Sequence, residues 1–371
     1  MAGLYLHVPF CKSKCAYCGF YSVASLKRKG DYLESLKQEI IQRKDYLHGE
    51  PVHTVYFGGG TPSILSIDEL KSIITQLHET FDIVPQAEIT LEANPDTLSL
   101  EYLESLRQLG INRLSIGIQS FFDNDLQYLS RKHNSAHALE CVGLAKKAGF
   151  ENINLDLIYG LPTSDADQWN RNLDLFLEMD VPHLSAYALT LEPNSILTKL
   201  IEQGKTAPVN EEDAVREYEI LCQKMAQHGF VHYEISNFCK PQMQSRHNTS
   251  YWFGIPYLGL GPSAHSYDGT SRQWNEGNGE RTTENGKPFE RETLSPEQRY
   301  DEYVMLRLRT MWGIDLKYMR REMGERFYDY CLRQAEPLIA QKRLSRTGDS
   351  LYLTDEQMLF ADGIAEELFW A

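Results

Sequence analysis

The chain has 371 residues, 42% of them hydrophobic and 24% charged, which is enough for one sizeable core and a smaller second domain. Its 52 acidic and 37 basic residues give a net charge of −15 at pH 7, and this charge argues against a general affinity for nucleic acids or anionic lipids. No run approaches the roughly 20 apolar residues that span a membrane, and the first residues lack the pattern of a secretion signal. Four of the seven cysteines are scattered, which is a poor pattern for disulfides. We therefore expect a cytoplasmic protein with a small-molecule ligand.

Six short apolar runs alternate with stretches of helical periodicity in the first half of the chain. They cover residues 3–8, 52–57, 88–92, 113–119, 152–158 and 183–190. Such alternation predicts parallel strands joined by right-handed crossovers. Polar residues near the ends of three strands, Glu92, Gln119 and Asp156, would meet at one mouth if the sheet curved into a barrel. We therefore predict an α/β fold with a partial (βα)6 TIM-like barrel over residues 1–237.

A change of composition near residue 237 predicts the end of the barrel. Residues 238–294 are rich in glycine, asparagine, serine and aromatic residues and are expected to form a linking region. Residues 295–371 carry helical patterns and one segment, LSRTGDSLYLT, in which a Gly-Asp turn lies between apolar runs. We predict a smaller, mostly helical C-terminal domain that contains one hairpin.

Three cysteines, Cys11, Cys15 and Cys18, follow the first predicted strand with the spacing C-x3-C-x2-C. Structural zinc sites and electron-transfer clusters generally use four protein ligands. Three thiolates around a 4Fe-4S cubane leave one iron open to an outside ligand, and S-adenosylmethionine (SAM) can fill this position through its amino and carboxylate groups. Zinc is the alternative, with His7 or a later histidine as the fourth ligand. Tyr17 lies between the second and third cysteines, where its ring could pack on an adenine, and this favours SAM.

The segment CKSKCAYC resembles the radical SAM signature, and LYLHVPFCKSKCAYCGFYS resembles the branch of that family that contains anaerobic coproporphyrinogen III oxidase and the HemW-type heme chaperones. Further similar segments run through nearly the whole chain: YFGGGTPSIL, ITLEANP, RLSIGIQSFFDNDLQYLSRKH, INLDLIYGLP and RHNTSYWFGIPYLGLGPSAHS. The resemblance implies a radical SAM barrel that holds a 4Fe-4S cluster on the three cysteines and binds SAM beside it.

Several residues at the ends of predicted strands have the chemistry that a SAM site needs. A run of glycines after the second strand lets the backbone approach a ligand, carboxylates accept hydrogen bonds from an amino group or from ribose, and an arginine pairs with a carboxylate. Each such residue alone more often marks a turn, a cap or a surface ion pair. By resemblance, the SAM contacts are Tyr5, Gly59, Gly60, Thr61, Glu92, Gln119, Arg131 and Asp156, with Tyr17 against the adenine.

Two positions separate the branches of the family. Phe20 stands where the oxidase branch has an additional cysteine, whereas residues 247–252, HNTSYW, match the H-N-x-x-Y-W segment of the chaperone branch. The resemblance therefore implies that the chain binds heme, with His247 as the candidate axial ligand because neutral imidazole commonly ligates heme iron. His265 and Cys239 are weaker candidates. A hydrogen-bonding histidine or a free buried cysteine is the ordinary alternative for each.

The function implied by the resemblance is that of a heme chaperone, which holds the cluster and SAM and delivers heme to a membrane respiratory enzyme. The resemblance also suggests a homodimer. The alternative is an oxygen-independent coproporphyrinogen III oxidase, against which the missing cysteine at Phe20 argues. A zinc-stabilised binding protein is the third alternative.

Overall fold

One large sheet organises this computed structural model, which describes residues 1–193, 195–277 and 289–370. In these residues the sheet has twelve strands. They are β1 (Ala2–Val8), β2 (Val52–Gly59), β3 (Ile83–Ala93), β4 (Arg113–Gln119), β5 (Asn152–Tyr159), β6 (His183–Ala188), β7 (Val231–Glu234), β8 (Asn237–Cys239), β9 (Tyr257–Leu260), β10 (His265–Tyr267), β11 (Ser271–Asn275) and β12 (Phe289–Thr293).

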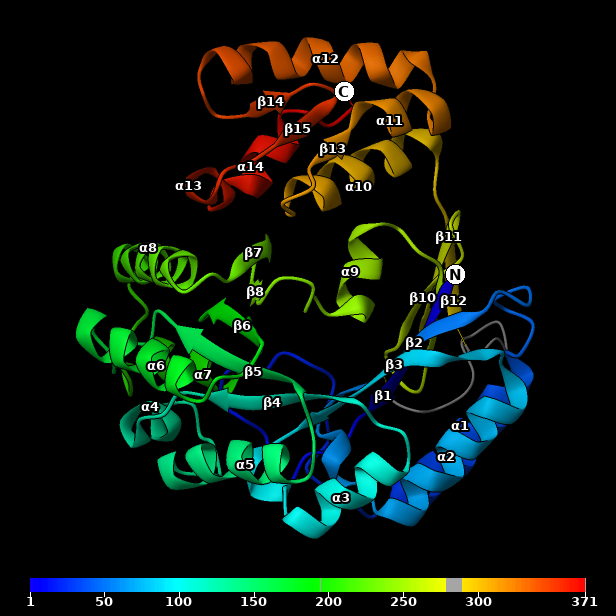
Figure 1. Ribbon diagram of the computed structural model, residues 1–371, viewed down its shortest axis with the longest axis vertical. Helices are drawn as coiled ribbons and strands as arrows, with labels where there is room; N and C mark the ends of the chain where they lie inside the picture. The colour runs from blue at the N-terminus through cyan, green and yellow to red at the C-terminus, as the bar shows by residue number, and fades with distance from the viewer. Residues whose placement is uncertain (194, 278–288, 371) are drawn as a thin grey trace.

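Neighbouring strands in the middle of the sheet run parallel. The order across the sheet is β12-β11-β10-β9-β1-β2-β3-β4-β5-β6-β8-β7, and β9 together with β1 to β6 forms the parallel part. Antiparallel strands extend both edges. In the described part of the chain this order has two ends, so the sheet is an open, partial barrel (Figure 1). All six predicted strands are present, and the predicted α/β partial barrel is confirmed.

Helices follow the strands of the barrel and cover the outside of the sheet (Figure 1). One of them begins at a capping box, in which Glu69 N donates to Ser66 Oγ at 3.3 Å and Ser66 N donates to Glu69 Oε2 at 2.8 Å. The helices of this part are α1 (Lys29–Gln42), α2 (Ile67–Thr80), α3 (Leu100–Gln108), α4 (Asp123–Tyr128), α5 (Ser135–Lys147), α6 (Ala166–Glu178), α7 (Ile196–Glu202), α8 (Glu211–Gln227) and α9 (Arg246–Trp252), with short 3-10 turns at Pro62–Ile64 and Pro95–Thr97.

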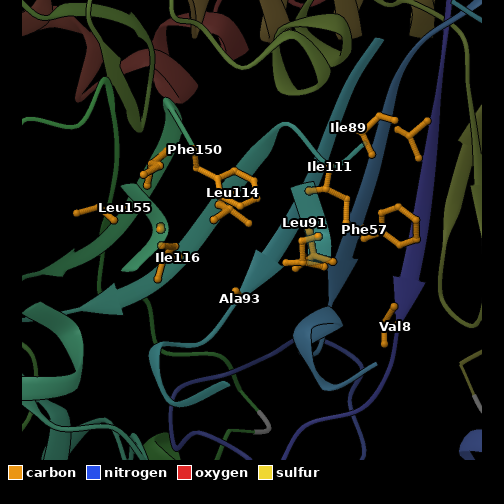
Figure 2. Packing of buried hydrophobic residues seen from close by; sticks show 14 of the residues in the cluster. Val8, Phe57, Ile89, Leu91, Ala93, Ile111, Leu114, Ile116, Phe150 and Leu155 are labelled. Atoms are coloured by element: carbon orange, nitrogen blue, oxygen red, sulfur yellow. The ribbon is translucent and has the colours of Figure 1, made fainter. Parts of the chain in front are cut away.

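Side chains of the parallel strands alternate between an apolar outer face and a polar inner face. Leu91 of β3 and Leu114 and Ile116 of β4 belong to the buried apolar layer beneath the helices (Figure 2). Glu92 and Ser115 alternate with them along the same strands and line a cavity inside the barrel. Burial of the outer layer supplies the main hydrophobic core, which leaves the inner face free for polar groups.

The segment 238–294, expected as a linking region, contributes strands to the same sheet. β9 pairs in parallel with β1, from Gly3 opposite Tyr257 to Leu6 opposite Leu260. β10, β11 and β12 then form an antiparallel extension at this edge, and residues 278–288 lie outside the described residues. These strands have only three to five residues, and such short strands carry too few repeats for period-two alternation to show in the sequence.

The C-terminal part folds around a core of its own, which confirms the predicted helical region. Its elements are α10 (Pro296–Leu308), β13 (Ile314–Asp315), α11 (Leu316–Glu322), α12 (Glu325–Ala340), β14 (Ser345–Thr347), β15 (Ser350–Tyr352), α13 (Asp355–Met358) and α14 (Ala361–Glu366). Tyr300, Phe327 and Leu351 are among the buried residues of this core. The predicted hairpin is formed by β14 and β15, and Gly348 between them adopts a φ of 58°, which favours glycine.

Leu114→Ala is expected to lower the free energy of unfolding by about 2–5 kcal/mol, because it leaves a cavity in the apolar layer between sheet and helices. Leu114 is 0% exposed, whereas Leu139 on α5 is 44% exposed. Leu139→Ala is therefore the matched control, and it should change the stability by no more than about 0.5 kcal/mol. Urea unfolding followed by circular dichroism measures both variants, and equal losses would contradict this assignment of the core.

Candidate functional site

A cavity of about 430 Å³ lies at the carboxyl ends of the parallel strands, where barrels place their functional side chains. We call it the cysteine cavity because Cys11, Cys15 and Cys18 line it. The other predicted site residues that line it are Tyr17, Gly59, Gly60, Thr61, Glu92, Gln119, Arg131 and Asp156. The fold thus gathers residues from four strands and their loops around one space, whereas Tyr5 and His247 lie elsewhere.

The loop that carries the cysteines is held by backbone hydrogen bonds to distant segments. Cys11 N donates to Val23 O at 3.1 Å, and Ala16 N donates to Leu129 O at 3.1 Å. Ala16 is buried between the second and third cysteines, which anchors the loop against the end of α4. The loop therefore has a defined conformation without being helix or strand.

Two of the three thiols accept hydrogen bonds from polar side chains. Thr61 Oγ1 donates to Cys11 Sγ at 3.5 Å, and Arg131 Nη1 donates to Cys15 Sγ at 3.4 Å. Burial raises the pKa of Cys18, which disfavours a free thiolate at that position. The Thr61 hydroxyl and the Arg131 guanidinium thus help to fix the positions of the first two sulfurs at the cavity.

The three thiols suit a cluster better than a single metal ion. Within the described residues, no three His, Cys, Asp or Glu side chains lie close enough together to hold one ion. A cubane binds each cysteine to a different iron, so its thiolates are spaced more widely than the ligands of zinc. His7 does not complete a zinc site, because its Nε2 lies 2.9 Å from Tyr21 O and its Nδ1 lies 3.2 Å from Tyr5 Oη. The donor set fits a 4Fe-4S cluster with one iron left without a protein ligand.

Two glycines at the end of β2 let the chain pack closely on β1 and on the start of the cysteine loop. A Cβ at Gly60 would lie 2.7 Å from Phe10 O, and a Cβ at Gly59 would lie 2.8 Å from the ring of His7. Gly59 also has a φ of 106°, which residues with a side chain rarely adopt. Both positions therefore require glycine for packing, in addition to the access to a ligand that the sequence indicates.

Two half-buried carboxylates face the cysteine cavity. Tyr56 Oη donates to Glu92 Oε1 at 2.8 Å, and Gly59 N donates to Glu92 Oε2 at 3.2 Å. Asn154 Nδ2 donates to Asp156 Oδ1 at 2.7 Å. Burial raises the pKa of Glu92 to about 7 and the pKa of Asp156 to about 6. Both groups thus titrate close to neutral pH, and in the ionised form each attracts a cation in the cavity.

Arg131 offers the cavity a guanidinium that forms no ion pair with a carboxylate of the described residues. Its Nη2 donates to Gly117 O at 2.7 Å and to Asn94 Oδ1 at 2.6 Å. Its Nε is buried without a hydrogen-bond partner among the described residues, and none of their carboxylates forms an ion pair with it. Such a side chain can pair with the carboxylate of a ligand. Gln119 nearby has a φ of 69°, a strained conformation that tends to occur at functional sites.

A second cavity, of about 550 Å³, shares a wall with the first. We call it the tyrosine cavity because Tyr5, Tyr56, Tyr187 and Tyr251 line it. Glu92 and Tyr187 line both cavities. Tyr5, predicted from the sequence to contact SAM, lines the tyrosine cavity and not the cysteine cavity.

His247 lies in α9, in the wall of the tyrosine cavity, and both of its ring nitrogens are hydrogen-bonded. Nδ1 lies 2.8 Å from Thr54 Oγ1, and Nε2 lies 2.8 Å from Tyr251 Oη. The backbone N–H groups of Arg246 and His247 donate to the Glu88 carboxylate, each at 3.0 Å. Burial lowers the pKa of His247 to about 3, so the imidazole is neutral at physiological pH. A metal can reach Nε2 only if the Tyr251 hydroxyl moves away.

The weaker candidates lie apart from both cavities. His265 is exposed on β10, and Cys239 is buried on β8 opposite His183. Neither lines the cysteine cavity or the tyrosine cavity. Phe20, in contrast, lines the cysteine cavity with 68% of its surface exposed, although its ring offers no group that binds iron.

The polar residues of the cysteine cavity that sequence reasoning missed include Asn94, Ser115 and Tyr187. Each lies on or just beyond a predicted strand, an even number of residues from another inward-facing residue of that strand. Asn94, for example, follows Glu92 by two positions. Period-two alternation was the signal that could have found them, because side chains two residues apart share a face of a strand.

Comparisons with known proteins identify the family of the chain. The model of the Radical SAM superfamily matches residues 5–176, and the model of the HemN C-terminal domain matches residues 294–360. Heme chaperone HemW from Mycobacterium tuberculosis is 34% identical over 99% of this chain and 94% of its own length. Heme chaperone HemW from Bacillus subtilis is 34% identical over 98% of each chain.

Among solved structures, coproporphyrinogen III oxidase (HemN) from Escherichia coli, a radical SAM enzyme, has a similar fold, with a TM-score of 0.85. The match covers 99% of this chain and 90% of the HemN chain, at 24% sequence identity. This identity supports a common fold and no more. The HemW relatives are more similar in sequence and cover nearly the full length of both chains, and they confirm the resemblance seen in the sequence. The chain therefore belongs to the HemW family of radical SAM proteins.

Proposed function

We propose that this chain is a heme chaperone, which binds heme, holds a 4Fe-4S cluster and SAM, and delivers heme to a membrane respiratory enzyme. The observation that carries the proposal is the wall shared by two cavities, to which Glu92 and Tyr187 contribute. A cofactor in the cysteine cavity would lie directly beside a ligand in the tyrosine cavity. The relatives named as heme chaperones support heme as that ligand.

Cys11, Cys15 and Cys18 would hold the cluster, and the iron without a protein ligand would receive SAM. When bound, the cluster supplies the electron for reductive cleavage of SAM. Thr61 and Arg131 would support the thiolates of the first two cysteines, because they already donate hydrogen bonds to these sulfurs. The half-buried loop would limit the access of water to the cluster.

The remaining residues of the cysteine cavity would bind and orient SAM. Arg131 would pair with its carboxylate, while Glu92 and Asp156 would accept from its amino group or ribose hydroxyls and attract its sulfonium cation. Tyr5 lies opposite Tyr56, the donor to Glu92, and would act on SAM from the neighbouring cavity. The other proposed contacts are Gly59, Gly60, Thr61 and Gln119, with Tyr17 against the adenine.

The tyrosine cavity has the properties that a heme site requires. Its volume of about 550 Å³ lies within the range of ligand pockets, and Tyr251 and Trp252 provide aromatic surface for a macrocycle. Arg309, also in its wall, pairs with Asp362 at 2.6 Å, and a propionate would share its guanidinium with that carboxylate. His247 is held in the neutral form that ligates iron, and it would bind through Nε2 once Tyr251 turned away.

Delivery of heme requires a receiving protein. None of the helices that the structure describes is long and apolar enough to cross a membrane. We propose that the chain acts in the cytoplasm as a homodimer and reaches the membrane through the respiratory enzyme that takes the heme.

Cys15→Ala is expected to abolish the cluster, because a cubane that loses one of three protein ligands has two irons without protein support. Cys222→Ala on α8 is the matched control, since Cys222 is half-buried and does not line the cysteine cavity. Iron and sulfide analysis after anaerobic reconstitution, with EPR of the reduced protein, measures the outcome. Wild-type protein that contains zinc without sulfide would contradict the cluster.

SAM affinity is expected to fall as the pH drops through about 7, because burial places the pKa of Glu92 there and its protonated form no longer attracts the sulfonium. Glu92→Gln should bind SAM about tenfold more weakly at about pH 8 and should lose most of this pH dependence. Calorimetric titration of reconstituted protein with SAM between about pH 6 and pH 8 measures it. A flat wild-type profile over this range would disprove the role of Glu92.

His247→Ala is expected to weaken hemin binding by about tenfold or more and to change the Soret band, because an axial ligand is lost. Tyr251→Phe should bind hemin at least as well as wild type, since it removes the hydroxyl that occupies Nε2. His265→Ala is the control, as this exposed histidine lies outside the tyrosine cavity. Unchanged hemin binding by His247→Ala would exclude His247 as a ligand. In a separate assay, formation of protoporphyrinogen from coproporphyrinogen III would contradict the chaperone function.

A further inference from the structure

A third cavity, of about 470 Å³, lies on the other side of α9 from the tyrosine cavity. We call it the basal cavity because Ala2 and His53, near the amino ends of β1 and β2, line it. Residues three and four positions apart lie on the same face of a helix, so α9 presents one face to each cavity. The tyrosine cavity receives His247, Asn248, Tyr251 and Trp252, and the basal cavity receives Arg246, Thr249 and Ser250.

The basal cavity has an apolar, partly aromatic wall that solvent can reach. Phe253 is 42% exposed and Met311 is 37% exposed, although both are large apolar side chains. The rings of Phe253 and Trp312 meet edge to face with their centroids 5.0 Å apart. The guanidinium of Arg307 lies 4.2 Å from the Phe253 centroid and further restrains this ring. Such a preformed wall suits a flat apolar ligand.

A β-bulge directs His53 out of the regular strand pattern. Ala2 lies opposite Val52 and Gly3 lies opposite Thr54, so His53 is an extra residue without a partner on β1. Its side chain lines the basal cavity, and neither ring nitrogen has a hydrogen-bond partner in the described residues. Bulges often re-aim a side chain at a functional site. His53 therefore offers a free imidazole to a metal, whereas both nitrogens of His247 are occupied.

The polar groups of the basal cavity favour an anionic ligand. The described residues that line it include no aspartate or glutamate, although the chain as a whole carries a net charge of −15. Arg246 is exposed, donates from Nη1 to Gln86 O at 2.8 Å, and forms no ion pair with a described carboxylate. Thr249 Oγ1 is buried without a hydrogen-bond partner in the same part of the structure. A carboxylate on the ligand would satisfy both side chains.

We propose that the basal cavity is a second heme site, in which His53 ligates the iron, Phe253 and Trp312 pack on the macrocycle, and Arg246 binds a propionate. The inference rests on the proposed heme-binding function of the chain. A flat metal macrocycle with carboxylates matches the aromatic wall, the free imidazole and the guanidinium without an ion pair. None of these three groups alone would identify heme as the ligand. The two heme sites would lie on opposite faces of α9.

Hemin titration of the full-length chain, followed in the Soret region, tests the proposal. The wild type is expected to bind two equivalents, and His53→Ala should bind one at wild-type affinity and the other about tenfold or more weakly. Arg246→Glu alters an exposed side chain outside the core, and it should weaken the same site by a similar factor. His228→Ala on the surface of the barrel is the matched control and should behave as wild type.

Iron-free protoporphyrin IX separates ligation from packing. It is expected to bind His53→Ala as tightly as wild type, because it has no iron for an imidazole to ligate. It should bind Arg246→Glu more weakly than wild type, because this variant loses the contact with the propionate. The basal site would be overturned if the wild type bound a single hemin, if His247→Ala abolished this binding, and if His53→Ala and Arg246→Glu left it unchanged. The proposed chaperone function would not be affected by that result. A wild-type chain that binds no hemin would overturn both.

Discussion

The alternation of polar inward and apolar outward side chains along the parallel strands is the constraint on which the cavities depend. Helices bury the outer layer, and the inner face consequently carries groups that would be costly in an ordinary core. Arg113 is 1% exposed, and its Nε and Nη1 have no hydrogen-bond partner among the described residues. Its charge opposes the rise in pKa that burial causes at Glu92 and Asp156. The interior of the barrel thus contains ionisable side chains, and an apolar layer surrounds it.

The position of α9 follows from the amino ends of the same strands. Glu88 of β3 accepts the first backbone N–H groups of this helix, and Thr54 of β2 meets the imidazole of His247. A Cβ at Gly3 would lie 2.9 Å from Thr54 Oγ1 and 3.4 Å from the ring of His247, so β1 can approach the helix only with glycine there. One helix of seven residues is therefore tied to three strands, and it divides the tyrosine cavity from the basal cavity.

Three cavities thus follow one another through shared walls. The cysteine and tyrosine cavities share Glu92 and Tyr187, and the tyrosine and basal cavities have α9 between them. In such an arrangement, a ligand bound in one cavity can affect a ligand in the next cavity through the residues between them, without touching it. The Glu92 carboxylate is the clearest connection, because Tyr56 of the tyrosine cavity and Gly59 of the cysteine cavity both donate to it.

Local spacing and motifs in the sequence were enough to predict the six strands, the C-terminal hairpin and the family, and they led to eleven of the residues that line the cysteine cavity. These features depend on neighbours along the chain, which periodicity and motifs report. Tertiary structure alone decided that Tyr5 faces a different cavity, that Tyr251 and Thr54 occupy both nitrogens of His247, and that β9 joins β1. It also decided that a bulge frees the imidazole of His53, since pairing between strands distant in sequence leaves no mark on local periodicity.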